Sequence, residues 1–365
     1  MMGVSVTVPD ATLASSGIKV GRAADILRSG GLVAFPTETV YGLGADAADE
    51  EAVKKIFALK GRPADHPVIV HLASVATLGD WAEVPGIAYA LAEAFWPGPL
   101  TLILKRRAWV PDVVTGGQAT VGLRVPAHPV ALALLRRFGG GVAAPSANRF
   151  GRVSPTTAAH VRAEFGDVVP VLDGGACRVG LESTILDLSG GAPKVLRPGA
   201  VSVAQLGEIT REITGEALTA PELNSEPGHD APRVPGGLSS HYAPLTPTFL
   251  LGSAVGVSGA RDAVLARRPQ AAEAACWLSL PDDPDAFGRG LYAALRDLDV
   301  PDHARILVEA PPDTPAWAAV RDRLGRAAEP LRPIPETRHS QVSQPQFQLQ
   351  APKRDTPERE AEETR

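Results

Sequence analysis

Residues 32–44 read Leu-Val-Ala-Phe-Pro-Thr-Glu-Thr-Val-Tyr-Gly-Leu-Gly, a short apolar run followed by a loop rich in hydroxyl groups and glycine. The apolar residues 32–35 predict a buried strand that ends at Pro36. Residues 42–47 then match the dinucleotide-binding pattern G-x-G-x-x-A, but that pattern requires a strand that runs directly into the glycine turn. Because residues 36–41 intervene, we interpret the two glycines as a tight turn and not as a Rossmann fingerprint.

Helices and strands are expected to alternate from this stretch to about residue 215, which predicts one α/β domain with a twisted mixed sheet. Apolar residues at helical spacing indicate the helices, and short apolar runs between breakers indicate the strands. The expected helices cover residues 18–29, 49–59, 87–96, 128–138, 155–165 (with Ser154 as N-cap) and 203–213. The expected strands cover residues 32–35, 68–72, 100–104, 121–125, 142–144, 168–172, 183–188 and 194–196.

The rest of the chain predicts a linker, a second domain and a tail, after a first domain at residues 1–215. Pro, Gly, Ser and Asn dominate residues 216–247, as is typical of an interdomain linker. Residues 248–330 predict a small Rossmann-like parallel α/β domain. Its strands are expected at 248–251, 274–280 and 305–308, and its helices at 260–267, 285–298 and 315–327. Residues 331–365, rich in Gln, Pro, Glu and Arg, are expected to be disordered.

Composition excludes several classes of protein. With 36 Lys and Arg against 41 Asp and Glu, the net charge of −5 has the wrong sign for a whole-protein grip on nucleic acid. No apolar run approaches the roughly 18 residues of a membrane span, and no signal peptide is recognisable. The two cysteines, Cys177 and Cys276, support neither a disulfide scaffold nor a four-ligand zinc site. We therefore expect a cytoplasmic protein without a membrane partner.

Basic and small polar side chains recur where predicted elements of the first domain end. Lys60 and Arg62 follow a helix, where they either cap its C-terminus or hold phosphate oxygens through a point charge and a planar fork. Ser146 and Asn148 follow a strand, where they either form an ordinary turn or contact a ligand at the sheet edge.

Two further arginines and a histidine raise the same question. Arg124 lies in the middle of an apolar strand, so it either pairs with an acid such as Glu182 or faces an anionic ligand. Arg197 lies at a strand end. His71 lies in an apolar strand, where a lone histidine is more often a core residue than a functional one. Because these signals share one domain, they jointly favour one concave site for a phosphate-bearing ligand.

Seven motifs follow one another along the first domain. They are residues 35–44, Lys60-Gly-Arg-Pro63, Trp96-Pro-Gly-Pro-Leu-Thr101, Thr120-Val-Gly-Leu-Arg-Val-Pro126, Ala144-Pro-Ser-Ala-Asn148, Glu182-Ser-Thr-Ile185 and Leu196-Arg-Pro-Gly199. Two later segments of interest are residues 235–244 and 287–299. The seven motifs, in this order, resemble the threonylcarbamoyl-AMP synthase family, which has the YrdC-like fold, and the two later segments resemble the long form of that family, with its linker and extra C-terminal domain.

The resemblance implies a nucleotidyltransferase that makes L-threonylcarbamoyladenylate and pyrophosphate from L-threonine, bicarbonate and ATP. A separate transferase would use this product for the N6-threonylcarbamoyladenosine at position 37 of certain tRNAs. Mg²⁺ would enter with ATP and be held by phosphates and water, so no metal-binding residues are expected. A contact with tRNA or another RNA is compatible with the resemblance.

The resemblance also implies individual roles. Lys60 and Arg62 would be the catalytic residues and would hold phosphates, and Thr37 is an alternative to Thr39 as a threonine contact. His66 stands where the family commonly has Asn. The implied ATP-binding residues are Lys60, Arg62, Thr120, Ser146, Asn148, Ser154, Arg197 and Tyr242. The implied threonine-binding residues are Thr39, His71, Arg124, Ala144 and Ser183, with Arg124 paired to the threonine carboxylate.

Other functions explain the sequence less well. A double-stranded RNA-binding module would use a basic concave face, but residues 1–210 hold 19 Lys and Arg against 18 Asp and Glu, which is nearly neutral. A carbamoyl-transfer domain of a hydrogenase-maturation factor is disfavoured because zinc-finger cysteines are missing. The pairs Lys60/Arg62 and Ser146/Asn148 disfavour a catalytically silent homologue.

Overall fold

The computed structural model describes residues 18–215, 218, 232–237, 241–252 and 259–330. The predicted tail, residues 331–365, lies outside these described residues, and so does most of the predicted linker, 216–247. Within the described part, no helix has the length and apolar character needed to cross a bilayer.

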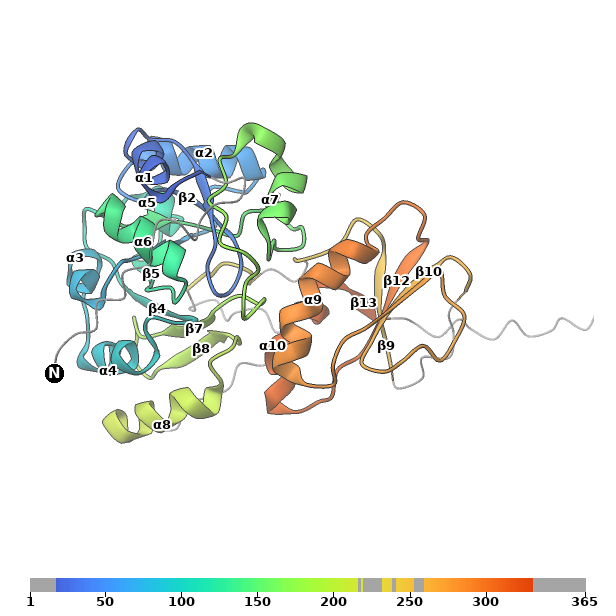
Figure 1. Cartoon of the computed structure of the whole chain (residues 1–365). Coiled ribbons are helices and arrows are strands. Elements are labelled where there is room, and N and C mark those ends of the chain that lie inside the picture. Colours follow the sequence, from blue (N-terminus) through green and yellow to red (C-terminus); the bar gives the residue numbers. More distant parts are fainter. Residues whose placement is uncertain (1–17, 216–217, 219–231, 238–240, 253–258, 331–365) are drawn as a thin grey trace, which may run out of the picture. The chain divides into compact units, whose positions relative to one another are not determined.

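The first part of the chain forms an eight-stranded mixed sheet in the order β1-β2-β6-β3-β5-β4-β7-β8 (Figure 1). The pairs β3–β5 and β4–β7 are parallel, and the other neighbouring pairs are antiparallel. The predicted twisted mixed α/β sheet is thereby confirmed. The strands are β1 Val33–Phe35, β2 Gly42–Asp46, β3 Ile69–His71, β4 Leu100–Lys105, β5 Thr120–Arg124, β6 Val142–Ala143, β7 Thr184–Asp187 and β8 Lys194–Arg197.

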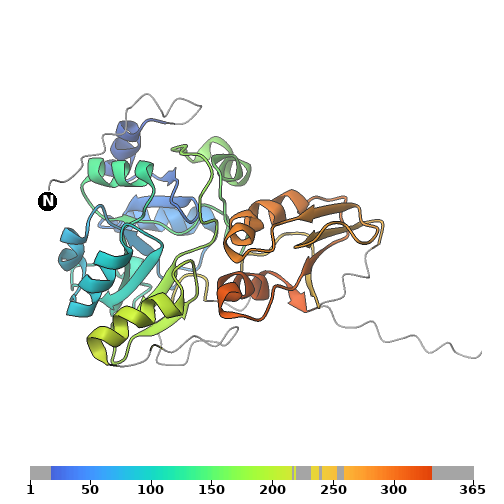
Figure 2. The same cartoon turned by 60° about the horizontal axis from the view of Figure 1, so that its bottom comes forward.

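The helices around this sheet begin and end at recognisable signals. Asp49 caps α2 by accepting from the backbone N–H groups of Glu51 and Ala52, and Gly61 ends α2 in the left-handed conformation. Figure 2 shows α8 next to α4, with which it is in contact. The helices are α1 Val20–Arg28, α2 Glu50–Lys60, α3 Leu78–Trp81, α4 Gly86–Phe95, α5 Asp112–Thr115, α6 Pro129–Phe138, α7 Ala158–Phe165 and α8 Val203–Thr214.

The predicted tight turn at Gly42 and Gly44 is wrong, because both residues lie in strand β2, paired antiparallel with β1. A Cβ atom on Gly44 would lie only 2.8 Å from the ring of Phe35 and from the side chain of Val142. Glycine therefore serves close packing here and not a turn conformation. The rejection of the Rossmann fingerprint is consistent with this strand, since no helix follows the glycines directly.

Two predictions between residues 154 and 172 are also wrong. Helix α7 begins at Ala158, and its N-cap is Thr157, whose hydroxyl accepts from the N–H of His160; Ser154 is not the cap. The expected strand at residues 168–172 is reduced to a single bridge between Val171 and Ala34. Residues 166–168 instead form a 3₁₀ turn at the end of α7, so Val168 belongs to that turn and not to a strand.

The C-terminal part forms a five-stranded sheet in the order β11-β10-β12-β9-β13, with every neighbouring pair parallel. This confirms the predicted small parallel α/β unit. The expected helix at 260–267 is wrong, because these residues supply the buried strand β10 near the sheet centre. A short, fully buried apolar run does not reveal whether it is a helix or a strand. The elements are β9 Thr248–Leu251, β10 Asp262–Ala266, β11 Cys276–Ser279, α9 Pro284–Leu298, β12 Arg305–Glu309, α10 Ala318–Ala327 and β13 Glu329–Pro330.

Helices α9 and α10 share an apolar core with residues of the first sheet's loops. Leu291 and Leu324 belong to the same buried cluster as Val40, Leu181 and Tyr242. The last three residues belong to or adjoin the loops that surround the candidate site. Packing of α9 and α10 therefore bears directly on the shape of that site.

Candidate functional site

A pocket opens where loops meet several strand ends of the first sheet. The loop after β1, the segments that follow β6 and precede β7, and the chain at 235–242 surround it. Its lining residues are Thr37, Thr39, Val40, Gly42, Arg62, Ile69, His71, Arg124, Ala144, Pro145, Ser146, Glu182, Ser183, Arg197, Pro235, Gly236, His241 and Tyr242.

Arg124 reaches the loop after β1 from its position at the end of β5. Its Nη2 lies 2.6 Å from Oε1 of Glu38, its Nη1 donates to Oγ1 of Thr39 at 3.0 Å, and its Nε donates to the carbonyl of Gly98. The sequence left open whether Arg124 pairs with an acid such as Glu182 or faces a ligand. Its acidic partner is Glu38, and the guanidinium also lines the pocket.

Both candidate threonines of the loop lie in the pocket wall and contact each other. The hydroxyls of Thr37 and Thr39 are 2.7 Å apart, and the hydroxyl of Thr37 also donates to the carbonyl of Val40. His71 lines the same wall, and its Nδ1 has no hydrogen-bond partner among the described residues. Burial, followed by the nearby Arg124 guanidinium, lowers the pKa of His71 to about 3, so its imidazole is neutral at physiological pH.

Lys60 and Arg62 take different positions. The Nζ of Lys60 donates to the carbonyls of Ser146 and Asn148, so the ammonium group fastens that loop and does not line the pocket. Arg62 does line the pocket. Its Nη2 donates to the carbonyl of Pro67 at 2.8 Å, while its buried Nε has no partner in the described part of the chain. The predicted phosphate contacts of both residues stay predictions.

Burial lowers the pKa of both cations. The pKa of the Lys60 ammonium lies well below its ordinary value because of burial and the neighbouring Arg62. Burial lowers the pKa of Arg62 to about 10, which still leaves the guanidinium charged at neutral pH. Arg62 is therefore a permanent positive charge in the pocket wall.

Arg197 faces the pocket from the end of β8 and is held by backbone groups. Its Nε and Nη2 both donate to the carbonyl of Ser183, and its Nη1 donates to the carbonyl of Pro235 at 2.7 Å. The hydroxyl of Ser183 is further hydrogen-bonded to Thr101 and to Arg197. Arg197 thus links the start of β7 to the chain at residue 235.

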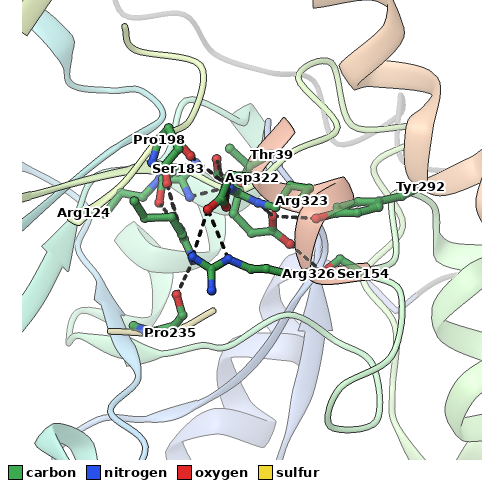
Figure 3. Close-up of polar contacts among 12 residues, drawn as sticks. Thr39, Arg124, Ser154, Ser183, Pro198, Pro235, Tyr292, Asp322, Arg323 and Arg326 are labelled. Carbon is green, nitrogen blue, oxygen red and sulfur yellow. Dashed lines mark hydrogen bonds and ion pairs between the residues drawn. The ribbon is translucent and has the colours of Figure 1, made fainter. Parts of the chain in front are cut away.

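Glu182 is a carboxylate of the pocket wall, whereas Glu38 contacts the wall through Arg124. Its Oε1 accepts from the hydroxyl of Ser154 at 2.6 Å, and its Oε2 accepts from Tyr292 at 2.8 Å and from Nε of Arg323 at 2.7 Å (Figure 3). Burial raises the pKa of Glu182, but Arg323 and then Arg197 outweigh burial and hold it at about 2. Glu182 is therefore ionised and fully engaged.

His241 and Tyr242 close one side of the pocket. Tyr242 is 1% exposed and has a φ of 63°, the left-handed region that non-glycine residues seldom occupy. Its ring lies 4.1 Å, centroid to centroid, from that of His241. Gly236, with a φ of 79°, approaches so closely that a Cβ atom there would lie 2.0 Å from the Tyr242 hydroxyl.

The structure thus brings together at one pocket most residues that the sequence singled out. Four predicted residues are not among those that line it: Lys60, Thr120, Asn148 and Ser154. Glu38, Gly236 and His241 do belong to the pocket or support it, but were given no role. Glu38 lies inside the segment Pro36-Thr-Glu-Thr39, and an acid in that loop could have been predicted to pair with the buried Arg124. Arg323 offered none, since it stands in an ordinary charged helix.

Two family models match the chain. One, described as telomere recombination (Sua5/YciO/YrdC), matches residues 25–199, and one described as the C-terminal domain of threonylcarbamoyl-AMP synthase matches residues 201–329. A threonylcarbamoyl-AMP synthase of Pyrococcus abyssi is 40% identical over 330 residues, which are 85% of this chain and 94% of the relative. The chain belongs to the threonylcarbamoyl-AMP synthase family.

Other relatives agree with this assignment. The threonylcarbamoyl-AMP synthase of Bacillus subtilis is 38% identical over 336 residues, 87% of this chain and 94% of the relative. The crystal structure of P. abyssi Sua5 complexed with L-threonine matches with a TM-score of 0.76 and 37% identity, covering 85% of this chain and 95% of that one. The predicted membership of the threonylcarbamoyl-AMP synthase family and the predicted enzymatic function are confirmed, and the RNA-binding alternative gains no support.

Proposed function

We propose that this chain is a nucleotidyltransferase that converts L-threonine, bicarbonate and ATP into L-threonylcarbamoyladenylate and pyrophosphate. In this reaction bicarbonate loses hydroxide to give CO₂, and the unprotonated threonine amine bonds to the carbon of CO₂. The nitrogen gives up a proton, which combines with the hydroxide as water, and the product is a carbamate. A carbamate oxygen then bonds to the α-phosphorus of ATP, and the bond to pyrophosphate breaks. Catalysis of this kind rests on positioning and on neutralising charge, and requires no covalent nucleophile.

The charge balance of the pocket is the observation that carries the proposal. Arg62 and Arg197 line it, and no carboxylate of the described residues lies within ion-pair distance of either. The two carboxylates at the site, Glu38 and Glu182, are already paired with Arg124 and Arg323. Two arginines without acidic partners provide the planar, permanently charged donors that phosphate oxygens prefer.

Another group of lining residues suits an amino acid. Thr39, His71 and Arg124 lie together, and this group offers a hydroxyl, a neutral imidazole and a guanidinium to the hydroxyl, amine and carboxylate of threonine. We assign the phosphate side to Arg62, Ser146 and Arg197, with Tyr242 covering the nucleotide. Lys60 would act indirectly, because its hydrogen bond to the carbonyl of Ser146 holds the loop that carries the Ser146 hydroxyl.

Mg²⁺ enters as part of the Mg-ATP substrate in this proposal, held by phosphate oxygens and water. Across the described ranges, no three His, Cys, Asp or Glu side chains gather as a metal site. The carboxylates of Glu38 and Glu182 are committed to arginines. The product would pass to a separate transferase that modifies adenosine 37 of tRNA.

Pyrophosphate release with single substrates omitted tests the proposal. Release should require ATP, threonine and bicarbonate together, and serine or glycine in place of threonine should support it poorly. Release that persists at full rate without threonine would refute the proposed reaction.

A further inference from the structure

Arg323 is a fully buried arginine of helix α10, in the C-terminal part of the chain, yet two of its four hydrogen bonds go to Glu182 in the pocket wall and a third goes to the neighbouring segment at Pro198. Its Nε donates to Oε2 of Glu182 at 2.7 Å, and its Nη1 donates to the carbonyl of Pro198 at 3.0 Å (Figure 3). Its exposed fraction is 0%. A buried ion pair of this geometry leaves a costly unpaired charge if one partner is removed.

Glu182 is one peptide bond from the residue that anchors Arg197. Arg197 donates twice to the carbonyl of Ser183, and both Glu182 and Arg197 line the pocket. After Arg323, the guanidinium of Arg197 is the next positive charge that lowers the pKa of Glu182. Without Arg323, we therefore expect an ionised Glu182 to turn to Arg197 for compensation. Such a pair would remove one of the two pocket arginines that lack an acidic partner.

We propose that Arg323 is a positioning residue for the nucleotide site: it neutralises Glu182 and thereby leaves Arg197 available to an anionic ligand. This inference rests on the proposed function, because it takes that ligand to be the triphosphate of ATP. It also gives the C-terminal part of the chain a role in the reaction, because its helix α10 supplies the positive charge that pairs with Glu182.

The same helix supports the residues that close the pocket. The carbonyl of Arg326 accepts from the backbone N–H of His241 at 3.1 Å, and the Arg323 guanidinium lies 5.5 Å from the centre of the Tyr242 ring. Asp322 holds both arginines, with Nη1 of Arg323 at 2.5 Å and Nη2 of Arg326 at 2.9 Å. Helix α10 thus fixes Glu182 and Tyr242 at once.

Four variants separate this role from a merely structural one. Arg323→Met removes the compensating charge, and Arg323→Met combined with Glu182→Gln removes both charges. Glu182→Gln alone removes the carboxylate but keeps Arg323. As a matched control, Arg305→Met removes an arginine of the C-terminal sheet that forms two hydrogen bonds, both 2.9 Å, with Asp262 and does not line the pocket. Circular dichroism and thermal unfolding establish that each variant is folded.

The readouts are the KM values for ATP and threonine from pyrophosphate release, together with direct ATP binding by calorimetry. Arg323→Met should raise the KM and Kd for ATP at least about tenfold, equivalent to about 1.4 kcal/mol, and the KM for threonine less than about threefold. The double variant should restore ATP binding to within about threefold of the unsubstituted protein, and Arg305→Met should change neither constant.

The inference is overturned if folded Arg323→Met weakens ATP and threonine equally, or if the double variant binds ATP as poorly as the single one. Should Arg323→Met fail to fold, Glu182→Gln still decides: unchanged or tighter ATP binding supports the inference, and a tenfold loss overturns it. Failure of the proposed function is recognised separately, since the unsubstituted protein would then release no pyrophosphate while ATP binding remains measurable in every variant.

Discussion

Arg124 and Glu38 form a buried ion pair that joins strand β5 to the loop after β1, with 2.6 Å between Nη2 and Oε1. The other oxygen of Glu38 accepts from the backbone N–H of Ala127 at 3.0 Å. The carboxylate therefore holds two segments, and Arg124 supports the wall that carries Thr39. Arg124 combines a structural and a ligand-binding task, and the two tasks predict different consequences of substitution.

Arg124→Met should lower the free energy of unfolding by about 3–5 kcal/mol, because it leaves Glu38 charged and buried. Adding Glu38→Gln should recover part of that stability, but the KM for threonine should stay raised at least about tenfold, since the contact to its carboxylate is still missing. Denaturant titration and pyrophosphate release measure the two effects. If ATP and threonine requirements rise equally in the double variant, Arg124 is only structural.

Arg62→Ala should abolish most threonine-dependent pyrophosphate release while the fold persists. The lost guanidinium is one of two pocket arginines without an acidic partner among the described residues, so kcat/KM should fall at least about tenfold. Arg136→Ala, at an exposed position of α6 outside the pocket, is the matched control and should keep normal turnover. Normal turnover in folded Arg62→Ala would exclude the phosphate role.

Gly236→Ala should displace Tyr242, because the new methyl group would lie 2.0 Å from the tyrosine hydroxyl. We expect weaker ATP binding, by at least about tenfold, in addition to the roughly 1–2 kcal/mol that a left-handed non-glycine residue costs. Gly139→Ala has the same backbone cost, with a φ of 86°, but a Cβ atom there meets nothing within 4 Å. Equal ATP binding by the two variants would show that Tyr242 does not cover the nucleotide.

The buried imidazole of His71 predicts a loss of stability in acid. Its pKa is lowered to about 3 in the folded protein, mainly by burial, whereas an unfolded histidine titrates near 6.5. Between these values the unfolded chain binds more protons, so the free energy of unfolding falls as pH drops from 6.5 towards 3. Denaturation at pH 7.5 and 5.0 should show a smaller loss for His71→Gln than for the unsubstituted protein. An equal loss of unfolding free energy in the two proteins would contradict the lowered pKa of His71.

Local signals predicted the elements whose ends are set by the chain itself. Asp49 before α2 and Gly139 after α6 mark helix ends through hydrogen bonds and backbone freedom that neighbouring residues decide. Strands β2 and β10 escaped prediction because tertiary packing decides them. Position 44 requires glycine because Phe35 and Val142 leave no room for a Cβ atom. Strand β10 is apolar because it is buried between two neighbouring strands.

For the site, the sequence predicted many of the residues but not their hydrogen-bond partners. Residues at strand ends, such as Ser146, Ser183 and Arg197, were identified because sheet edges gather polar groups. Their hydrogen-bond partners were not, since the pairing of Arg124 with Glu38 and of Glu182 with Arg323 joins residues 86 and 141 positions apart. Such pairs depend on how elements pack, which no local pattern encodes.

The most direct measurement of the central claim is the product formed from ATP, threonine and ¹³C-labelled bicarbonate. The account predicts an adenylate that contains threonine and one labelled carbon, formed together with pyrophosphate. A threonyl-adenylate without the labelled carbon, or pyrophosphate with no threonine-containing adenylate, would contradict it.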